Sequence, residues 1–368
     1  MGSSDSVPIE RVDVHAFRIP TTTPESDGTF EWDSTTLVTV HLDGGGKQGF
    51  GYSYADNSTA VLIRSTFAPF IVGRNAMDGQ RIWADLIGMV RNIGRRGIAA
   101  MAISAVDAAL WDLRAKILDC ALVTLLGPVR ESVPVYGSGG FTSYTIAQLQ
   151  QQLGGWIVDR IPRVKMKVGR DPTADGDRVR ASRAAIGPGS ELFVDANGAY
   201  SVKLAMAMAE DFAGSGVSWF EEPVSSDDLQ GLRFIRERIP APVEVAAGEY
   251  GYELQYFDEM IAAGAVDVLQ ADATRCCGIT GFMKAAVLCE SRSVPLSAHC
   301  APSLHVHPGC AALPLRHLEY FYDHVRIESM LFDGVLAPRA GSIYPDLSRS
   351  GLGVELKFSD AKRFEVSL

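Results

Sequence analysis

Eight short apolar runs recur about every 20–30 residues after position 133, and this recurrence restricts the possible folds more than any other feature. Each interval is long enough for one helix and its connections, which is typical of repeated strand–helix units. Eight such units favour an α/β fold of the closed (β/α)8 TIM barrel type over an open doubly wound sheet. No G-x-G-x-x-G motif follows the first run, which further weakens a dinucleotide-binding interpretation. The runs are residues 133–136, 164–168, 192–194, 218–220, 243–246, 268–269, 294–297 and 317–320.

The chain before these runs predicts a smaller unit of strands followed by helices. Residues 7–18 alternate apolar and polar side chains, and residues 35–42 and 48–54 predict two further strands joined by a glycine turn. The polar, turn-rich residues 20–33 predict a loop. Residues 97–116 are rich in alanine and predict a buried helix at a domain junction.

Composition excludes several classes of function. Lys and Arg total 34 against 44 Asp and Glu, a net charge of −10, so nucleic acids and anionic membrane surfaces are poor partners. No run of about 18 apolar residues predicts a membrane span. The six cysteines form no C-x-x-C pair and are interpreted as small buried thiols of a reduced, cytoplasmic protein.

Ionisable residues stand where the predicted strands end, which is where barrel enzymes carry their active sites. Asp195, Glu221 and Glu249 follow the third, fourth and fifth strands. Adjacent strands lie about 4.8 Å apart, so these carboxylates can converge on one ion. A ligand set made only of oxygens favours Mg²⁺, with Mn²⁺ as a substitute, over zinc.

Two lysines and a histidine complete the predicted cluster. Lys165 and Lys167 share one face of the second strand, and we expect their repulsion to lower the pKa of one of them, as a lysine base requires. His299 follows the seventh strand, across the ring from the third. Asp272, after the sixth strand, is placed to fix one tautomer of that imidazole and to favour its protonated form.

Taken together, the motifs resemble those of the enolase superfamily, mandelate racemase subgroup. The resemblance covers essentially the whole chain from about residue 9, and the ordered set is far more specific than any single motif. The matching segments are AVDAALWDL (105–113), VKMKVG (164–169), VDANG (194–198), FEEP (220–223), AGE (247–249), QADATR (270–275), GITG (278–281), SAH (297–299) and LEY (318–320).

The resemblance implies an N-terminal α+β capping domain over residues 1–128 and a modified (β/α)8 barrel over residues 129–330. Residues 331–368 are expected to pack back on the cap. The resemblance also implies Mg²⁺ on the three carboxylates, with Lys167 and the His299–Asp272 pair on opposite faces of a small carboxylate substrate. By the same matching, Lys165 contacts the substrate carboxylate and Glu319 hydrogen-bonds to it, a role that suits a protonated acid.

Further roles follow from the same resemblance. Asn197 and Arg275 match polar and basic supporting positions, and two capping loops, residues 21–33 and 52–57, are expected to close the site. Tyr54 is the cap residue that we expect to contact the substrate. The chain is expected to form a homo-oligomer.

The expected reaction is abstraction of the proton α to the substrate carboxylate, through an enediolate stabilised by Mg²⁺. The polar first loop favours a sugar acid, an aldonate or aldarate, and its dehydration to a 2-keto-3-deoxy acid, although Phe30 and Trp32 would suit an aromatic acid. Two alternatives stay open. One is a racemase or epimerase of a 2-hydroxy acid, and the other is a barrel that binds a ligand without catalysis.

Overall fold

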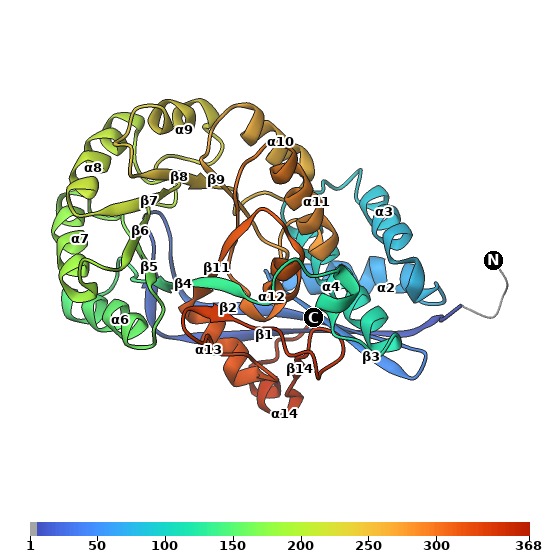
Figure 1. Ribbon diagram of the computed structural model, residues 1–368. Helices are drawn as coiled ribbons and strands as arrows, with labels where there is room; N and C mark the ends of the chain where they lie inside the picture. Colours follow the sequence, from blue (N-terminus) through green and yellow to red (C-terminus); the bar gives the residue numbers. More distant parts are fainter. Residues whose placement is uncertain (1–5) are drawn as a thin grey trace.

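The computed structural model describes residues 6–368, which form an antiparallel N-terminal sheet with helices beside a large closed barrel (Figure 1). Strands β1 (Ile9–Ser26), β2 (Glu31–Gly44) and β3 (Lys47–Tyr54) pair in the order β1-β2-β3. Gly45 and Gly46 turn the chain between β2 and β3 with φ values of 60° and 70°, which glycine adopts without strain.

The predicted loop over residues 20–33 is wrong for most of its length. β1 continues to Ser26 and β2 begins at Glu31, so the two strands extend as a hairpin with Glu25 opposite Trp32. The threonines after Pro20 favour extended backbone, which outweighs their polarity. Asp27 closes the tip, because its Oδ1 accepts hydrogen bonds from the backbone N–H groups of Thr29 and Phe30 at 2.6 and 2.7 Å.

The predicted junction helix is α4 (Ile98–Ile117), which is buried along most of its length. Strand β3 packs directly on it through two glycines: a Cβ on Gly49 or Gly51 would lie 2.4 or 2.3 Å from a carbonyl oxygen of α4. Only glycine permits this close approach. The other helices of this region are α1 (Asn57–Leu62), α2 (Ala68–Ile71), α3 (Gly79–Met89) and α5 (Leu122–Leu126).

All eight predicted barrel strands are present, and the predicted fold class is confirmed. They pair in parallel in chain order, and hydrogen bonds between the last and first strands close the ring. The strands are β4 (Val133–Gly139), β5 (Arg163–Lys167), β6 (Glu191–Asp195), β7 (Val217–Glu221), β8 (Glu244–Ala247), β9 (Val268–Ala271), β10 (Leu296–Ala298) and β11 (Leu315–Phe321). Aromatic rings of Tyr136, Phe193 and Trp219 fill the interior below the strand ends.

Helices surround the barrel on its outer side (Figure 1). They are α6 (Ile146–Val158), α7 (Pro172–Ile186), α8 (Val202–Gly214), α9 (Leu229–Arg236), α10 (Leu254–Ala262), α11 (Gly278–Ser291), α12 (Pro302–Ala311) and α13 (Tyr322–Leu331). No helix in the described part of the chain is both long and apolar enough to pass through a bilayer.

The C-terminal segment contacts both the barrel and the N-terminal sheet. Its strand β13 (Ser342–Ile343) pairs with β4, and Glu365 forms a bridge with Phe17 of β1. The Leu352 N–H donates to Asp112 of α4 at 2.6 Å. The remaining elements of this segment are β12 (Phe332–Asp333), β14 (Glu355–Leu356) and α14 (Phe358–Ala361).

Candidate active site

The hairpin tip of β1 and β2 lies against the open end of the barrel and forms part of its rim. Thr142 after β4 donates two hydrogen bonds here, from its N–H to the Ser26 carbonyl at 2.8 Å and from its hydroxyl to the Asp27 carbonyl at 2.8 Å. Gly28 has no room for a side chain, because a Cβ would lie 2.3 Å from the carbonyl oxygen of Ala196 in the loop after β6. The cap therefore covers the strand ends at close contact.

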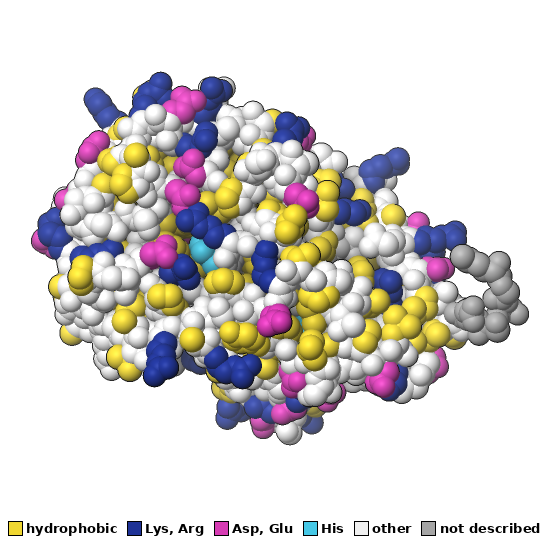
Figure 2. All heavy atoms as spheres, in the orientation of Figure 1, with side chains coloured by type: hydrophobic (Ala, Val, Ile, Leu, Met, Phe, Trp, Pro, Cys, Tyr) yellow, Lys and Arg dark blue, Asp and Glu magenta, His cyan; other side chains and the backbone are white. Residues whose placement is uncertain are grey.

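The predicted site residues gather beneath this rim. Lys165 and Lys167 lie on β5, Asp195 and Glu221 end β6 and β7, and the others follow β8, β9 and β10 or lie on β11. Figure 2 shows a histidine surrounded by Lys, Arg, Asp and Glu side chains in the hollow at this end of the barrel. The members buried to at least nine-tenths are Lys165, Lys167, Asp195, Glu221, Glu249, Asp272, His299 and Glu319.

The structure brings the three carboxylates proposed as metal ligands together. One oxygen from each of Asp195, Glu221 and Glu249 lies within 4.8 Å of the others. The order of the strands around the ring explains this, since β6, β7 and β8 are consecutive neighbours. Asn197, at a left-handed φ of 46°, donates its N–H to Asp195 Oδ1 at 2.9 Å and fixes that carboxylate.

The two lysines form ion pairs with the carboxylates, so their mutual repulsion does not make either of them neutral. Nζ of Lys167 lies 2.5 Å from Asp195, and Nζ of Lys165 lies 2.5 Å from Glu221 and 2.9 Å from Glu319. Burial lowers both lysine pKa values, but the adjacent carboxylates outweigh it and raise both above the ordinary value. The expectation of a lowered lysine pKa is therefore wrong for this arrangement, because it ignored the acids of the next two strands.

The histidine lies at the other end of the carboxylate trio. Its Nδ1 donates to Asp272 at 2.8 Å, and its Nε2 lies 3.1 Å from Glu249 Oε2. Burial alone would lower the pKa of His299, but Cys300, Glu249 and the other acids around it raise this pKa above its ordinary value. Lys167 at Asp195 and His299 at Glu249 thus flank the trio from opposite ends.

Glu319 is ionised in this arrangement. Burial raises its pKa, but Lys165 and His299 outweigh it and hold the pKa at about 2. The expectation of a protonated Glu319 is wrong for the structure as described, because the Lys165 ammonium lies 2.9 Å from one carboxylate oxygen.

The residues expected to bind substrate line one cavity of about 480 Å³ above the cluster. Asn197 and Arg275 reach it from the barrel, and the Arg275 guanidinium donates to the Glu249 carbonyl at 3.1 Å. Tyr54 also lines it, but its ring stacks on His324 with centroids 3.4 Å apart and its hydroxyl lies 3.4 Å from Glu328. The Tyr54 hydroxyl is therefore engaged within the protein, and its ring is the part available to a ligand.

Cys300 and His324 also line the cavity but were not among the residues predicted from the sequence to form the site. Cys300 carried a signal, since it directly follows His299 at a strand end. Burial and Glu319 raise the pKa of its thiol to about 12. Nothing in the sequence placed His324 of α13 at the barrel mouth, whereas Asp27 and Trp32 lie in the residues 21–33 that were expected to close the site.

The site fits a divalent cation on the carboxylate trio. Burial and Asp195 raise the pKa of Glu221, and burial and Glu249 raise the pKa of Glu222. The positive charges of the described Lys and Arg side chains therefore do not fully balance the negative charges of the buried carboxylates. Oε2 of Glu249 is buried and has no partner in hydrogen-bond geometry among the described residues. Oxygen donors with excess negative charge suit Mg²⁺.

Comparison with known proteins identifies the family on both parts of the chain. A sequence profile described as mandelate racemase / muconate lactonizing enzyme, N-terminal domain, matches residues 12–127. A second profile, described as enolase C-terminal domain-like, matches residues 148–361. The chain belongs to the mandelate racemase/muconate lactonizing enzyme family of the enolase superfamily. The family resemblance read from the sequence motifs is thereby confirmed.

Members of this family include a solved mandelate racemase/muconate lactonizing enzyme-like protein from Rubrobacter xylanophilus, 51% identical, with a TM-score of 0.96 over 98% of this chain and all of that chain. The 3,6-anhydro-alpha-L-galactonate cycloisomerase of Streptomyces coelicolor is 33% identical over 97% of this chain and 99% of its own length. The L-talarate/galactarate dehydratase of Salmonella typhimurium, solved with Mg and L-lyxarohydroxamate, is 27% identical, with a TM-score of 0.92 over 100% of this chain and 95% of that chain. Characterised relatives in the family therefore include dehydratases and cycloisomerases.

Proposed function

We propose that this protein is a Mg²⁺-dependent lyase that removes the proton α to the carboxylate of a sugar acid and expels the group on the β-carbon, giving a 2-keto-3-deoxy acid. The observation that carries the proposal is the placement of Lys167 and His299 at the two ends of one carboxylate trio, under a polar cavity. Dehydratases among the relatives support the same reaction class.

Asp195, Glu221 and Glu249 would hold Mg²⁺, which offsets the negative charge that develops on the substrate carboxylate as the α-proton leaves. Lys165 adds a fixed positive charge to the same region, since it lies between Glu221 and Glu319. Both features lower the free energy of the enediolate relative to the bound acid.

Lys167 and His299 supply the base and the acid. One of them takes the α-proton, and the electron pair of the broken C–H bond forms the enediolate. The pair then returns to expel the β-hydroxyl, which leaves as water after receiving a proton from the other residue. Asp272 is a positioning residue, because its hydrogen bond to Nδ1 at 2.8 Å leaves Nε2 facing the cavity.

The charges of the cavity favour an aldonate over an aldarate. Lys167 and Arg275 are the only Lys and Arg side chains among the described residues that line the cavity, and both are paired with acids. The cap side contributes hydroxyls and carboxylates from Ser34, Thr35, Thr36, Asp27 and Asp56. A polyol end can hydrogen-bond to these groups, whereas a second carboxylate would be repelled and lack a free cation.

A cycloisomerase is the second candidate, supported by the 33% identical relative that carries this name. The same base and acid would act, and the leaving group would be a ring oxygen of an anhydro or lactone sugar acid in place of a free hydroxyl.

The test is a panel of aldonates, aldarates and anhydro sugar acids with Mg²⁺, scored for keto-acid formation and for deuterium exchange at the α-carbon. We expect keto acid from a monocarboxylate, and Lys167→Ala and His299→Asn each to lower turnover by about 10²–10⁴-fold or more. Lys203→Ala and His15→Asn, which alter residues distant from the cavity lining, are the controls.

Two results of this panel would contradict the proposal and indicate a different function. Exchange at the α-carbon without elimination across the panel would indicate a racemase or epimerase. Binding of panel acids with neither exchange nor keto acid would indicate a barrel that binds its ligand without catalysis.

A further inference from the structure

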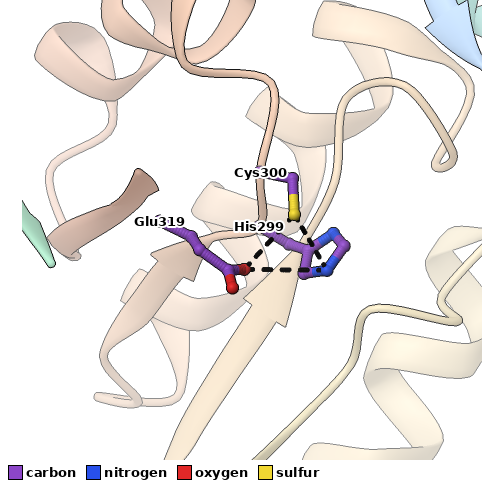
Figure 3. Close-up of side chains that lie close together, drawn as sticks. All are labelled: His299, Cys300 and Glu319. Atoms are coloured by element: carbon purple, nitrogen blue, oxygen red, sulfur yellow. Dashed lines mark hydrogen bonds and ion pairs between the residues drawn. The ribbon is translucent and has the colours of Figure 1, made fainter. Parts of the chain in front are cut away.

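Three side-chain atoms of different chemical type converge on the wall of the cavity, outside the carboxylate trio. His299 Nε2 and Cys300 Sγ lie 3.3 Å apart, Cys300 Sγ and Glu319 Oε2 lie 3.5 Å apart, and His299 Nε2 and Glu319 Oε2 lie 3.6 Å apart. Figure 3 shows the three groups pointing toward one another, His299 and Cys300 from the segment after β10 and Glu319 from β11. All three residues are buried.

We propose that His299 Nε2, Cys300 Sγ and Glu319 Oε2 form a second metal site, selective for a thiophilic divalent cation such as Zn²⁺ or Cd²⁺. This site adjoins the carboxylate trio, since His299 Nε2 lies 3.1 Å from Glu249 Oε2, but the two sites share no ligand, and its formation does not depend on the reaction proposed above.

The spacing of the ligand atoms matches one face of a tetrahedral zinc site. Zinc binds sulfur at about 2.3 Å, imidazole nitrogen at about 2.0–2.1 Å and carboxylate oxygen at about 2.0–2.2 Å. At the tetrahedral angle these bond lengths place the ligand atoms about 3.4–3.6 Å from one another. The observed separations of 3.3, 3.5 and 3.6 Å agree pair by pair within about 0.3 Å, so a cation needs little rearrangement of the ligands.

Each of two ligands is held in place by a further side chain, as the ligands of metal sites usually are. Asp272 accepts from Nδ1 of His299 at 2.8 Å, so Nε2 is the nitrogen that binds a cation once its proton has left, and Lys165 holds the other oxygen of Glu319 at 2.9 Å. The three residues line the cavity of about 480 Å³, which leaves a fourth position open to water or a ligand.

An unusual backbone turn brings adjacent residues to the same site. Side chains of successive strand residues alternate in direction, but β10 ends at Ala298 and Cys300 has a left-handed φ of 53°. The chain therefore turns directly after His299, and the thiol points into the same space as the imidazole (Figure 3).

The sulfur ligand determines the selectivity. Thiolate binds Zn²⁺ and Cd²⁺ strongly but is a poor ligand for Mg²⁺, so saturating Mg²⁺ fills the trio and leaves this site free. Binding releases the thiol proton and the Nε2 proton of the imidazolium to solvent and forms metal–sulfur and metal–nitrogen bonds in their place. Occupancy also takes the Nε2 lone pair of His299, which blocks proton transfer if His299 acts as proposed.

The test uses the full-length protein in saturating Mg²⁺, without substrate, titrated with Cd²⁺ and followed by thiolate-to-cadmium charge-transfer absorbance. We expect one equivalent of Cd²⁺ to give the band, and Zn²⁺ to displace it. Cys300→Ser and Cys300→Ala are each expected to remove the band and to weaken Zn²⁺ binding by at least about 10-fold. Cys277→Ser, which alters another buried thiol, is the matched control and is expected to keep the band.

Retention of the Mg²⁺-induced rise in melting temperature shows that the Cys300 variants are folded. An unchanged band in both variants, a band lost in Cys277→Ser, or no thiolate band in the parent protein would each overturn the proposal. Because the readout needs no turnover, failure of the proposed reaction leaves this test unaffected.

Discussion

Replacing Lys165 by methionine tests whether this lysine neutralises the buried acids of the barrel mouth. The side chain is fully buried, and its Nζ lies 2.5 Å from Glu221, 2.9 Å from Glu319 and 3.6 Å from Asp195. Methionine keeps most of the volume and removes the charge. In chelator, the variant would leave these carboxylates close together without their shared cation.

The size of the effect follows from the loss of one partner of a buried pair, which costs about 3–5 kcal/mol. Unfolding entropy near 60 °C is about 2.1 cal/mol/K per residue, or about 0.8 kcal/mol/K for 368 residues. Lys165→Met is therefore expected to lower the melting temperature by about 4–6 °C in chelator. Mg²⁺ should raise the melting temperature of the variant more than that of the parent, because a divalent charge enters a more negative site.

Differential scanning calorimetry with chelator and with saturating Mg²⁺ measures both quantities. Lys203→Met, at an exposed position on α8, is the matched control and is expected to change the melting temperature by less than about 1 °C. A Lys165→Met melting temperature equal to that of the parent in chelator would refute the reasoning, as would an identical Mg²⁺ response in the two proteins.

Two further predictions concern the hairpin of β1 and β2. Gly28→Ala should push the hairpin tip away from Ala196 and lower kcat/KM by about 10-fold or more with little change in melting temperature. Gly88→Ala, where a Cβ meets open space, is the control and should leave kcat/KM and the melting temperature unchanged. Equal steady-state kinetics in the two variants would contradict close docking of the hairpin. Burial and Asp323 raise the pKa of Glu25 to about 8, so the native state holds this proton more tightly and loses stability as the pH rises from about 4.5 to about 8. The unfolding free energy of Glu25→Gln should therefore equal that of the parent near pH 5 and exceed it by up to about 5 kcal/mol near pH 9. Denaturant titrations that give the same difference between the two proteins at both pH values would contradict this prediction.

The barrel and its charged strand ends were predictable because they depend on local patterns. Runs such as residues 192–194 are apolar and short, and the acid that ends each of them points into the mouth in any parallel barrel. The convergence of Asp195, Glu221 and Glu249 follows from chain order alone, since consecutive strands are neighbours.

Features that depend on contacts between distant segments were not predictable. The hairpin extension to Ser26 was missed because its polar residues resemble a loop, and its pairing depends on residues 31–34. The direction of the lysine pKa shifts depends on which carboxylate each ammonium reaches. The position of the Cys300 thiol beside His299 depends on a left-handed turn at Cys300, which no local sequence pattern indicates.

The docked hairpin of β1 and β2 separates, along the chain, the residues that border the cavity from the cap and those that border it from the barrel. Its tip, around Asp27 and Trp32, precedes Lys167, the first residue proposed for acid–base chemistry, by well over a hundred positions, yet both border the same cavity. Substitutions in the tip can thus alter which molecule is admitted without disturbing the groups proposed to move protons. A gene encoding such a chain can acquire a new substrate specificity by drift in one short hairpin while its reaction chemistry stays constant.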